Sequence, residues 1–358
     1  TIPYKTTMLA ICDDLTETAA TIGSVNTVLK QLDGSLLGDN TDAAGFEGMV
    51  WKSRIRILGR KCLVLGSGGA SLSAQYVLRK LGAGEVVVIS RTGENNYDNL
   101  DRHQDAAVIV NATPVGMYPN TGVSPVDLKR FPKLEGVLDV IYNPARTQLL
   151  LDAEALHIPC ANGLWMLVAQ AKESAEYFTG TSIDDAVIAE IHGKLAARMT
   201  NIVLIGMPGC GKSTIGALLA EKLGRKLVDA DEKIVRLAGK PIPAIFAEDG
   251  ETVFRDWETK ALSQLGKQSA LVIATGGGCV TQMRNYPMLH QNGVIFWLKR
   301  DISKLPTDGR PLSQTNPLDA MFAKRAPMYA AFADHTVSND GTAEETVAAI
   351  LSIMEEPI

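Results

Sequence analysis

The chain contains the glycine-rich segment GMPGCGKST at residues 206–214, directly after the apolar run NIVLI at 201–205. A turn of the form GxxxxGK[ST], placed between a strand and a helix, curls backbone N–H groups around phosphate oxygens. The partial positive charge at the start of the following helix strengthens that attraction. A chance glycine-rich turn would lack the flanking strand and helix. The segment therefore predicts a parallel α/β domain that binds a nucleotide where a strand ends.

Within this loop the residue types suggest separate tasks. Lys212 is expected to reach the terminal phosphates and Ser213 to ligate Mg²⁺, so ATP and Mg²⁺ are the implied cofactors. A thiol near a helix N-terminus tends to have a lowered pKa, so Cys210 is also expected to make the site sensitive to oxidants. The other residues expected around the phosphates are Gly206, Gly209, Cys210, Gly211 and Thr214.

Short apolar runs alternate with helical stretches in two blocks of the chain. The first block contains KCLVL, EVVVI, AAVIV and GVLDV, and the second contains IVLIG, KLVDAD, ALVIAT and GVIFWL. Buried β-branched runs that alternate with helices predict parallel sheets covered on both faces. The amphipathic stretch 182–197 runs into the second block without a Pro/Gly/Ser-rich linker, so a domain boundary is expected at about residue 198.

Composition narrows the classes of partner. The 358 residues carry a net charge of −5 with no basic cluster, which argues against nucleic acid. No apolar run approaches the ~20 residues that span a bilayer. The five cysteines are scattered without metal-binding spacing, which favours a reducing, cytoplasmic location. The oligomeric state stays open. Thr1 falls inside what looks like a strand end, so further sequence upstream is expected.

Acidic residues follow the second strand of the later block. Asp229 and Asp231 are two apart, so they are expected on one face of that strand. One carboxylate can hold Mg²⁺ through water, and the other can accept the proton of an attacking hydroxyl. A polar strand end that caps a helix is the simpler alternative. Arg255 and Glu258 have i,i+3 spacing, which lets the carboxylate orient the guanidinium.

Three further features of the later block complete a substrate pocket. Gly276, Gly277 and Gly278 follow the strand ALVIAT, where a small substrate can lie against bare backbone. Arg310 lies in a Pro/Gly/Asp-rich stretch expected to form a lid, and Arg325 lies on an expected helix.

The motifs GMPGCGKST, DAD, FRDWE, GGG, GRPL and RAPMY occur in this order over residues 206–329 and resemble shikimate kinase. The resemblance implies transfer of the ATP γ-phosphate to the 3-hydroxyl of shikimate. By resemblance, Asp231 binds and activates that hydroxyl, and Asp229 positions Mg²⁺. The remaining implied residues are Arg255 and Arg325 on the shikimate carboxylate, Gly277 and Gly278 against the ring, and Arg310 over the transferring phosphate. The family often has an adenine-stacking arginine before the lid, but residues 301–309 contain none, so base preference stays open.

A second glycine turn, GSGGAS at 66–71, follows the strand KCLVL and opens a helix. Ser71 replaces the third glycine of a dinucleotide fingerprint, so a simple tight turn is the alternative. The next strand ends in Ser90, Arg91 and Thr92, and an arginine there can grip a 2′-phosphate, which favours NADP(H) over NAD. The residues expected to bind this cofactor are Gly66, Ser67, Gly68, Gly69, Ala70, Ser90, Arg91, Thr92, Asn111 and Thr113.

Residues 1–180 resemble shikimate dehydrogenase. The motifs that carry this resemblance are the glycine turn together with TIPYK, GSVNT, GDNTDAAGF, NATPVGM and NGLWMLVAQ. The resemblance implies that Lys5 protonates the C3 oxygen of 3-dehydroshikimate while NADPH delivers hydride, with Asp42 holding the hydroxyl and Lys5 in register. Asn26, Thr27 and Gln170 match substrate-contacting positions, although Asn26 could simply cap a turn and Gln170 could be solvated.

The two resemblances divide the chain into four expected segments. They are a remnant of the dehydrogenase substrate domain (1–45), a Rossmann-like NADP domain (46–160), C-terminal dehydrogenase helices (161–197) and a P-loop kinase domain with a parallel sheet (198–358). The family has strands and a Ser-x-Ser loop before TIPYK that this sequence does not contain. The chain is therefore expected to bind NADPH but to reduce 3-dehydroshikimate poorly or not at all. Shikimate, the product of one reaction, is the acceptor in the other. The alternatives are a kinase for another small hydroxy acid and a first half that is an NADP-binding scaffold.

Overall fold

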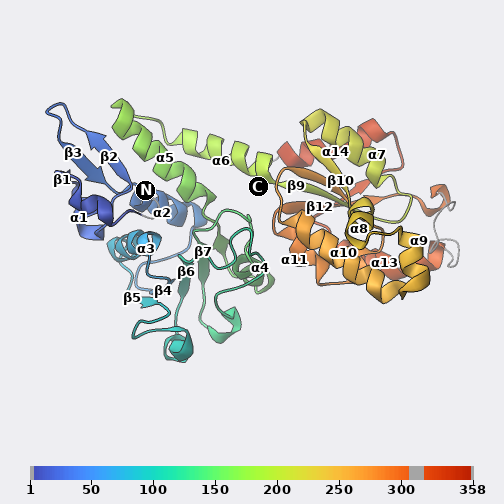
Figure 1. Cartoon of the computed structure of the whole chain (residues 1–358), viewed down its shortest axis with the longest axis horizontal. Helices are drawn as coiled ribbons and strands as arrows, with labels where there is room; N and C mark the ends of the chain where they lie inside the picture. Colours follow the sequence, from blue (N-terminus) through green and yellow to red (C-terminus); the bar gives the residue numbers. More distant parts are fainter. Residues whose placement is uncertain (1–3, 306–317, 356–358) are drawn as a thin grey trace. The chain divides into compact units, whose positions relative to one another are not determined.

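The structure is a computed structural model that describes residues 4–305 and 318–355. Contacts divide the chain into two compact units, Thr1–Lys194 and Leu195–Ile358. The first unit runs from blue to green in Figure 1 and the second from yellow-green to red. The expectation of an α/β chain with two parallel sheets is confirmed. The division falls inside helix α6 (Ala186–Met199), a few residues before the expected boundary at 198.

The first unit begins with a small three-stranded sheet in the order β1-β3-β2. Strands β1 and β3 are parallel, and β2 and β3 are antiparallel. Residues 4–6 form a turn rather than the strand end that the sequence suggested. The elements are η1 (Thr7–Ala10), β1 (Asp14–Leu15), α1 (Glu17–Ile22), β2 (Thr27–Lys30), β3 (Leu36–Asp39) and α2 (Asp42–Ser53).

A five-stranded parallel sheet in the order β5-β4-β6-β7-β8 forms the larger part of the first unit. Its strands are β4 (Lys61–Leu65), β5 (Glu85–Ile89), β6 (Val108–Asn111), β7 (Gly136–Asp139) and β8 (Cys160–Ala161). Its helices are α3 (Gly69–Lys80), η2 (Tyr97–His103), η3 (Leu128–Arg130), α4 (Gln148–Ala155), α5 (Leu164–Thr179) and α6 (Ala186–Met199). Helix α6 starts later than the predicted 182, because the Asp184 carboxylate accepts from the Ala186 amide and begins the helix there.

The strands of this sheet are apolar on both faces, as parallel sheets require. Cys62 and Val64 of β4 belong to one hydrophobic cluster, and Leu63 and Leu65 belong to another. Because successive strand residues point to opposite faces, the run KCLVL supplies both cores at once. Because β4 and β6 pair in parallel, the loops at their carboxyl ends lie at one edge of the sheet, where a ligand can bind.

The second unit is a five-stranded parallel sheet in the order β10-β11-β9-β12-β13. Its strands are β9 (Asn201–Ile205), β10 (Lys226–Asp229), β11 (Leu271–Ala274), β12 (Gly293–Lys299) and β13 (His335–Ser338). Its described helices are α7 (Lys212–Leu223), α8 (Ala230–Ala238), α9 (Ile242–Glu248), α10 (Gly250–Gly266), η4 (Cys279–Thr281), α11 (Asn285–His290), η5 (Ile302–Lys304), α13 (Leu318–Phe332) and α14 (Ala343–Glu355).

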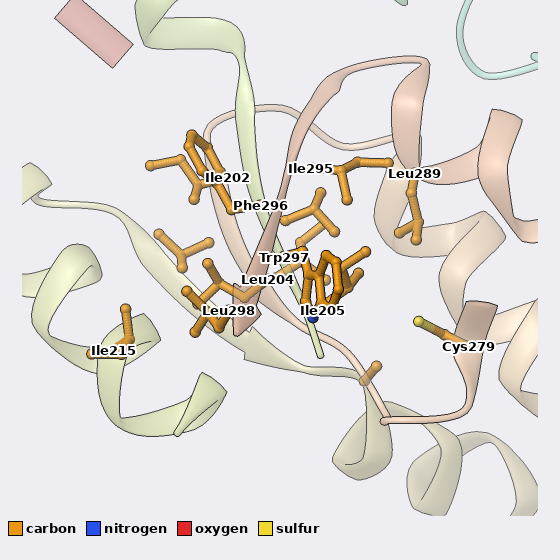
Figure 2. Close-up of a cluster of buried hydrophobic side chains, with 14 of the residues drawn as sticks. Ile202, Leu204, Ile205, Ile215, Cys279, Leu289, Ile295, Phe296, Trp297 and Leu298 are labelled. Atoms are coloured by element: carbon orange, nitrogen blue, oxygen red, sulfur yellow. The ribbon is translucent and has the colours of Figure 1, made fainter. Parts of the chain in front are cut away.

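Strand β9 lies in the middle of this sheet and every residue in it is buried. Figure 2 shows Ile202, Leu204 and Ile205 of β9 among side chains of β12, with Ile215 of α7 and Leu289 of α11 nearby. The chain crosses to opposite sides of β9 to form β11 and β12, so β9 is the point where the strand order reverses. Ligands of open α/β sheets bind at the carboxyl ends of strands at such a point. No helix in the described part of either unit is long and apolar enough to cross a membrane.

Candidate active sites

The glycine loop of the second unit joins β9 to α7. Gly211 is the N-cap of α7 with a φ of +96°, and a Cβ there would lie 2.7 Å from Asn339 Nδ2. Gly206 has a φ of +144°, and a Cβ there would lie 2.6 Å from the Leu298 carbonyl oxygen. Both positions therefore require glycine, because φ is left-handed and a neighbouring segment approaches closely. The resulting backbone turn opens at the helix N-terminus, as a phosphate site needs.

Lys212 is folded back onto this loop. Its Nζ donates to the carbonyl oxygens of Gly206 at 2.9 Å and Met207 at 3.0 Å. The side chain is 9% exposed, so its charge is held close to the loop that would receive phosphates. Cys210 has no exposed surface, and its carbonyl accepts from Asn339. The expected oxidant sensitivity at Cys210 finds no support, because a peroxide in solvent does not reach a fully buried thiol.

Ser213 and Asp229 form the candidate Mg²⁺ site. Ser213 Oγ donates to Asp229 Oδ2 at 3.1 Å, so a hydroxyl and a carboxylate from α7 and β10 meet at one edge of the cavity. Mg²⁺ prefers oxygen ligands and keeps several waters, so two protein ligands beside a triphosphate fit this ion. The chemistry of the donor set supports the metal assignment made from the sequence.

Asp229 and Asp231 do not share a strand face, contrary to expectation. Asp229 ends β10 and is the N-cap of α8, where its Oδ1 accepts from the Asp231 amide at 2.9 Å. Asp231 therefore lies in the first turn of α8 and points separately into the cavity. The Asp231 side chain is accessible to water, but the walls of the cavity exclude much of the solvent around it. That burial, followed by the charge of Asp229, raises the pKa of Asp231.

Arg255 and Glu258 are both buried on α10. Arg255 Nη1 donates to Glu258 Oε2 at 2.9 Å, as the i,i+3 spacing indicated, and Nη2 donates to Glu251 Oε1 at 3.0 Å. A Cβ at Gly278 would lie 2.3 Å from Arg255 Nη1, so the glycine leaves room for the guanidinium. A Cβ at Gly276 would lie 3.0 Å from Glu258 Oε1. The glycine triplet thus lets the charged groups approach the cavity.

Helix α13 supplies the second arginine of this pocket. Arg325 Nη1 donates to the Gly277 carbonyl oxygen at 3.3 Å, and the Tyr329 hydroxyl donates to the same oxygen. Arg325 and Tyr329 are four residues apart on one face of α13, so together they hold the glycine segment that follows β11 in place. Tyr329 and Asn339 are site residues that the sequence reasoning did not assign. Arg310, the expected lid residue, lies outside the described residues.

One cavity of about 630 Å³ joins these groups. It contains phosphate-loop residues, both aspartates, both arginines and an apolar wall from α9 and α10. The lining includes Lys212, Ser213, Thr214, Asp229, Asp231, Phe246, Phe254, Arg255, Gly277, Gly278 and Arg325. A lysine in the phosphate loop, two aspartates and two arginines in one cavity suit a nucleotide and a small acidic acceptor.

The candidate catalytic pair of the first unit is already in contact. Lys5 Nζ forms an ion pair with Asp42 Oδ2, although the two residues come from a turn and from the start of α2. Asn26 Nδ2 donates to Asp42 Oδ1 at 2.9 Å, and Asn26 Oδ1 accepts from the Thr41 amide at 2.9 Å. Thr27 donates to the same Asn26 oxygen at 3.0 Å. Asn26 therefore does more than cap a turn, because its amide group also holds the Asp42 carboxylate in position.

Lys5 also contacts the cofactor turn. A Cβ at Gly69, the first residue of α3, would lie 3.0 Å from Lys5 Cδ. Gly66 has a φ of +105°, and a Cβ there would lie 3.0 Å from the Ala112 carbonyl oxygen. The turn between β4 and α3 is thus narrow, and the lysine stem lies against it. Gln170 donates to the Leu167 carbonyl oxygen of its own helix, and within the described part of the chain it has no hydrogen bond to Lys5 or Asp42.

The loop after β6 is held by a buried carboxylate. Asp139 accepts from Asn111 Nδ2 at 3.1 Å and from Thr147 Oγ1 at 2.7 Å. Asn111 Oδ1 in turn accepts from the Thr113 amide and hydroxyl at 3.1 and 2.6 Å. Burial raises the pKa of Asp139 to about 6, against these hydrogen bonds. A cavity of about 330 Å³ opens here, and its lining includes Thr113, Met117, Tyr118, Ile141 and Tyr142.

Arg91 and its neighbours follow β5 on the surface. Strand β5 ends at Ile89, next to β4, so Ser90, Arg91 and Thr92 leave the sheet beside the glycine turn. Arg91 and Thr92 are exposed. This edge carries a cation where the 2′-substituent of a dinucleotide would lie in a doubly wound sheet.

These geometries define an α/β enzyme with a dinucleotide turn beside a Lys–Asp pair in one unit and a phosphate loop beside carboxylates and arginines in the other. The family model for shikimate kinase matches residues 208–355. A shikimate kinase from Prochlorococcus marinus (strain MIT 9313) is 42% identical over 139 residues, which cover 36% of this chain and 72% of that relative.

The N-terminal half has relatives of its own. An NADP(+) shikimate dehydrogenase from Clostridium perfringens (strain 13 / Type A) is 34% identical over 211 residues, covering 55% of this chain and 78% of the relative. A crystal structure of a chorismate mutase/shikimate 5-dehydrogenase fusion protein from Clostridium acetobutylicum superposes with a TM-score of 0.52 and 38% identity, covering 55% of this chain and 75% of that chain. The chain therefore belongs to the shikimate dehydrogenase family in its N-terminal half and to the shikimate kinase family in its C-terminal half.

Proposed function

We propose that the chain performs two successive reactions, the NADPH-dependent reduction of 3-dehydroshikimate to shikimate and the ATP-dependent phosphorylation of shikimate at its 3-hydroxyl. Membership of both families supports this pairing. The observation that carries the kinase assignment is the convergence of Lys212, Asp231, Arg255 and Arg325 on one cavity. The four-segment division of the chain and a cytoplasmic location accompany this proposal. All five cysteines are free thiols, which supports a reducing compartment.

In the kinase unit, Arg255 and Arg325 bind the shikimate carboxylate, since paired guanidinium groups suit a planar anion. Gly277 and Gly278 lie against the ring. Asp231 accepts the proton of the attacking hydroxyl, because its raised pKa brings a carboxylate closer to the role of a general base. Lys212 neutralises the transferring phosphoryl group, and Arg310 closes over it. Ser213 and Asp229 would hold Mg²⁺, which would supply positive charge to neutralise the phosphates.

In the dehydrogenase unit, Lys5 delivers a proton to the carbonyl oxygen at the carbon that receives hydride. Asp42 orients Lys5 through their ion pair and accepts a substrate hydroxyl. Asn26, Thr27 and Gln170 complete the substrate contacts. The contact of Lys5 with Gly69 supports this role, because it places the proton donor beside the turn that would hold the cofactor. NADPH supplies the hydride when bound.

The kinase proposal is tested with the full chain by measuring ADP release with and without shikimate. Lys212→Ala is expected to remove most shikimate-dependent turnover. Lys222→Ala, which changes an exposed lysine of the same helix, is the matched control and keeps the rate. Turnover with other small hydroxy acids but not with shikimate would favour the alternative kinase. ADP release that does not depend on any acceptor would refute both.

The dehydrogenase proposal is tested by following NADPH oxidation with 3-dehydroshikimate. Lys5→Ala is expected to abolish oxidation while NADPH still binds, and Lys30→Ala, an exposed lysine, leaves both unchanged. Arg91→Ala is expected to weaken NADPH more than NADH, because only the former carries a 2′-phosphate. NADPH binding without any substrate-dependent oxidation in the unchanged chain would instead identify the first unit as a binding scaffold.

A further inference from the structure

Arg300 lies beside the phosphate loop although no motif includes it. It follows β12 directly, and β12 pairs in parallel with β9, so both strands end at the same edge of the sheet. Arg300 lines the cavity that also contains Lys212 and Ser213. A Cβ at Gly211 would lie 3.9 Å from Arg300 Nη1. The guanidinium is thus next to the N-cap residue of the phosphate-binding helix.

Among residues 4–305 and 318–355, nothing accepts a hydrogen bond from the guanidinium of Arg300. Its Nε is buried without a hydrogen-bond partner, and no described residue accepts from the side chain. The acidic side chains on adjoining segments have other partners, since Asp301 caps the turn at 302–304 and Asp340 accepts from the Asp301 amide. A buried cationic donor without an acceptor destabilises a folded protein, so a group of this kind indicates a ligand that supplies the acceptor.

Asn339 also lies beside Gly211, but its polar side-chain atoms have partners within the protein. Its Nδ2 donates to the Cys210 carbonyl oxygen at 2.6 Å, and its Oδ1 accepts from Thr346 Oγ1 at 2.8 Å. Asn339 is therefore fully used in holding the loop to β13 and α14. Arg300 is the neighbouring polar group that the loop leaves available.

We propose that Arg300 is a further nucleotide-binding residue, whose guanidinium donates hydrogen bonds to a phosphate oxygen of ATP or ADP held in the loop 206–214. This inference rests on the proposed kinase function. A phosphate fits better than the base, because the buried Nε–H needs an acceptor in the plane of the guanidinium. Stacking on a base would use the face of that plane and leave Nε–H without a partner.

The test compares three variants of the full chain by calorimetric titration with Mg-ADP and with adenosine. Arg300→Met removes the charge and keeps the length of the side chain, while Arg300→Lys keeps the charge and removes the fork. Lys299→Met is the matched control, because it removes the same charge from the adjacent, exposed position outside the cavity. The midpoint of thermal unfolding, measured without ligand, shows whether Arg300 has a structural role.

Arg300→Met is expected to weaken Mg-ADP binding by roughly tenfold or more, as the loss of a hydrogen-bonded charge implies, and Arg300→Lys to weaken it less. Adenosine binding and the KM for shikimate stay unchanged, and Lys299→Met behaves as the parent. The midpoint of Arg300→Met without ligand is equal to that of the parent or higher, because the orphaned donor is gone.

Equal Mg-ADP affinity in Arg300→Met and the parent would overturn the inference while leaving the kinase function intact. Parallel weakening of adenosine would overturn the phosphate contact in favour of the base. A lowered midpoint without ligand would identify Arg300 as a structural residue. Failure of the parent chain to bind Mg-ADP would instead refute the kinase function itself.

Discussion

Glu258 holds Arg255 through a buried ion pair in which Oε2 accepts from Nη1 at 2.9 Å, while its Oε1 is buried without a hydrogen-bond partner. Glu251 binds the other end of the same guanidinium at 3.0 Å, but its side chain is 57% exposed. One arginine therefore has a buried and an exposed carboxylate partner, which allows the two kinds of pair to be compared directly.

Glu258→Ala is expected to destabilise the second unit by about 3–5 kcal/mol, because it leaves a buried guanidinium without its partner. Glu251→Ala is expected to cost less than about 1 kcal/mol, since solvent screens the exposed pair. Glu258→Ala is also expected to raise the KM for shikimate more than Glu251→Ala does, because Arg255 binds the shikimate carboxylate. Denaturant unfolding and initial rates measure both. Equal destabilisation by the two variants would show that Glu258 is not the residue that positions Arg255.

Asp231→Asn is expected to raise stability at neutral pH while it abolishes shikimate phosphorylation. Burial and the charge of Asp229 raise the pKa of Asp231, so the folded state binds its proton more tightly than the unfolded state does. Stability from this group is therefore present at low pH and falls as pH rises through the raised pKa. An amide removes that loss but accepts no proton. Glu232→Gln, at the next and exposed position of α8, is the control.

Thermal midpoints at pH 5 and pH 8, together with ADP release, measure this prediction. The midpoint of Asp231→Asn is expected to exceed that of the parent more at pH 8 than at pH 5, and Glu232→Gln is expected to behave as the parent. An Asp231→Asn protein that is less stable at pH 8, or that retains full turnover, contradicts the assignment of Asp231 as the base.

Ser213→Ala is expected to raise the Mg²⁺ concentration needed for half-maximal turnover and to leave the KM for shikimate unchanged. The reason is the shared edge where Ser213 Oγ meets Asp229 Oδ2 at 3.1 Å. Asp229→Asn is expected to have the same effect while keeping the N-cap of α8, because asparagine caps a helix about as well as aspartate. Titration of Mg²⁺ at fixed ATP is the measurement. A Mg²⁺ dependence identical to that of the parent in both variants argues against this metal site.

Asp139→Asn is expected to flatten the pH dependence of stability in the first unit. The pKa of Asp139 is raised to about 6 by burial, above the ~3.9 of an unfolded aspartate. The folded state therefore binds the proton more tightly, and stability falls as pH rises from about 4 to about 6, then stays level with respect to this group. The amide abolishes that slope, which denaturant unfolding between pH 4.5 and 7 measures.

Asp105→Asn is the control for Asp139. Hydrogen bonding to Lys61 lowers the pKa of this exposed carboxyl, so its contribution is complete above the unfolded pKa and is lost only at lower pH. Its substitution leaves the slope between pH 4.5 and 7 unchanged. If the stability of the parent and that of Asp139→Asn change equally with pH, another group in the first unit is responsible for the pH dependence.

Local spacing in the sequence determined which elements form and which residues lie at their ends. The phosphate loop, the glycine triplet and the i,i+3 pair of Arg255 and Glu258 follow from helix and strand periods alone, because neighbouring residues in one element have fixed separations. The alternation of apolar runs likewise determined two parallel sheets. Local spacing was misleading at Asp229 and Asp231, because the N-cap bond places the second residue in the helix rather than on the strand.

Tertiary structure decided which strand ends and loops meet. Lys5 reaches both Asp42 and Gly69 only because α2, which begins at Asp42, packs against α3, which begins at Gly69. Arg300 reaches the loop at Gly211 because β12 pairs with β9, a choice of neighbour that no local pattern encodes. Strand order and packing depend on the burial of whole faces, so contacts between distant segments and the burial of Cys210 appear only once the sheets have formed.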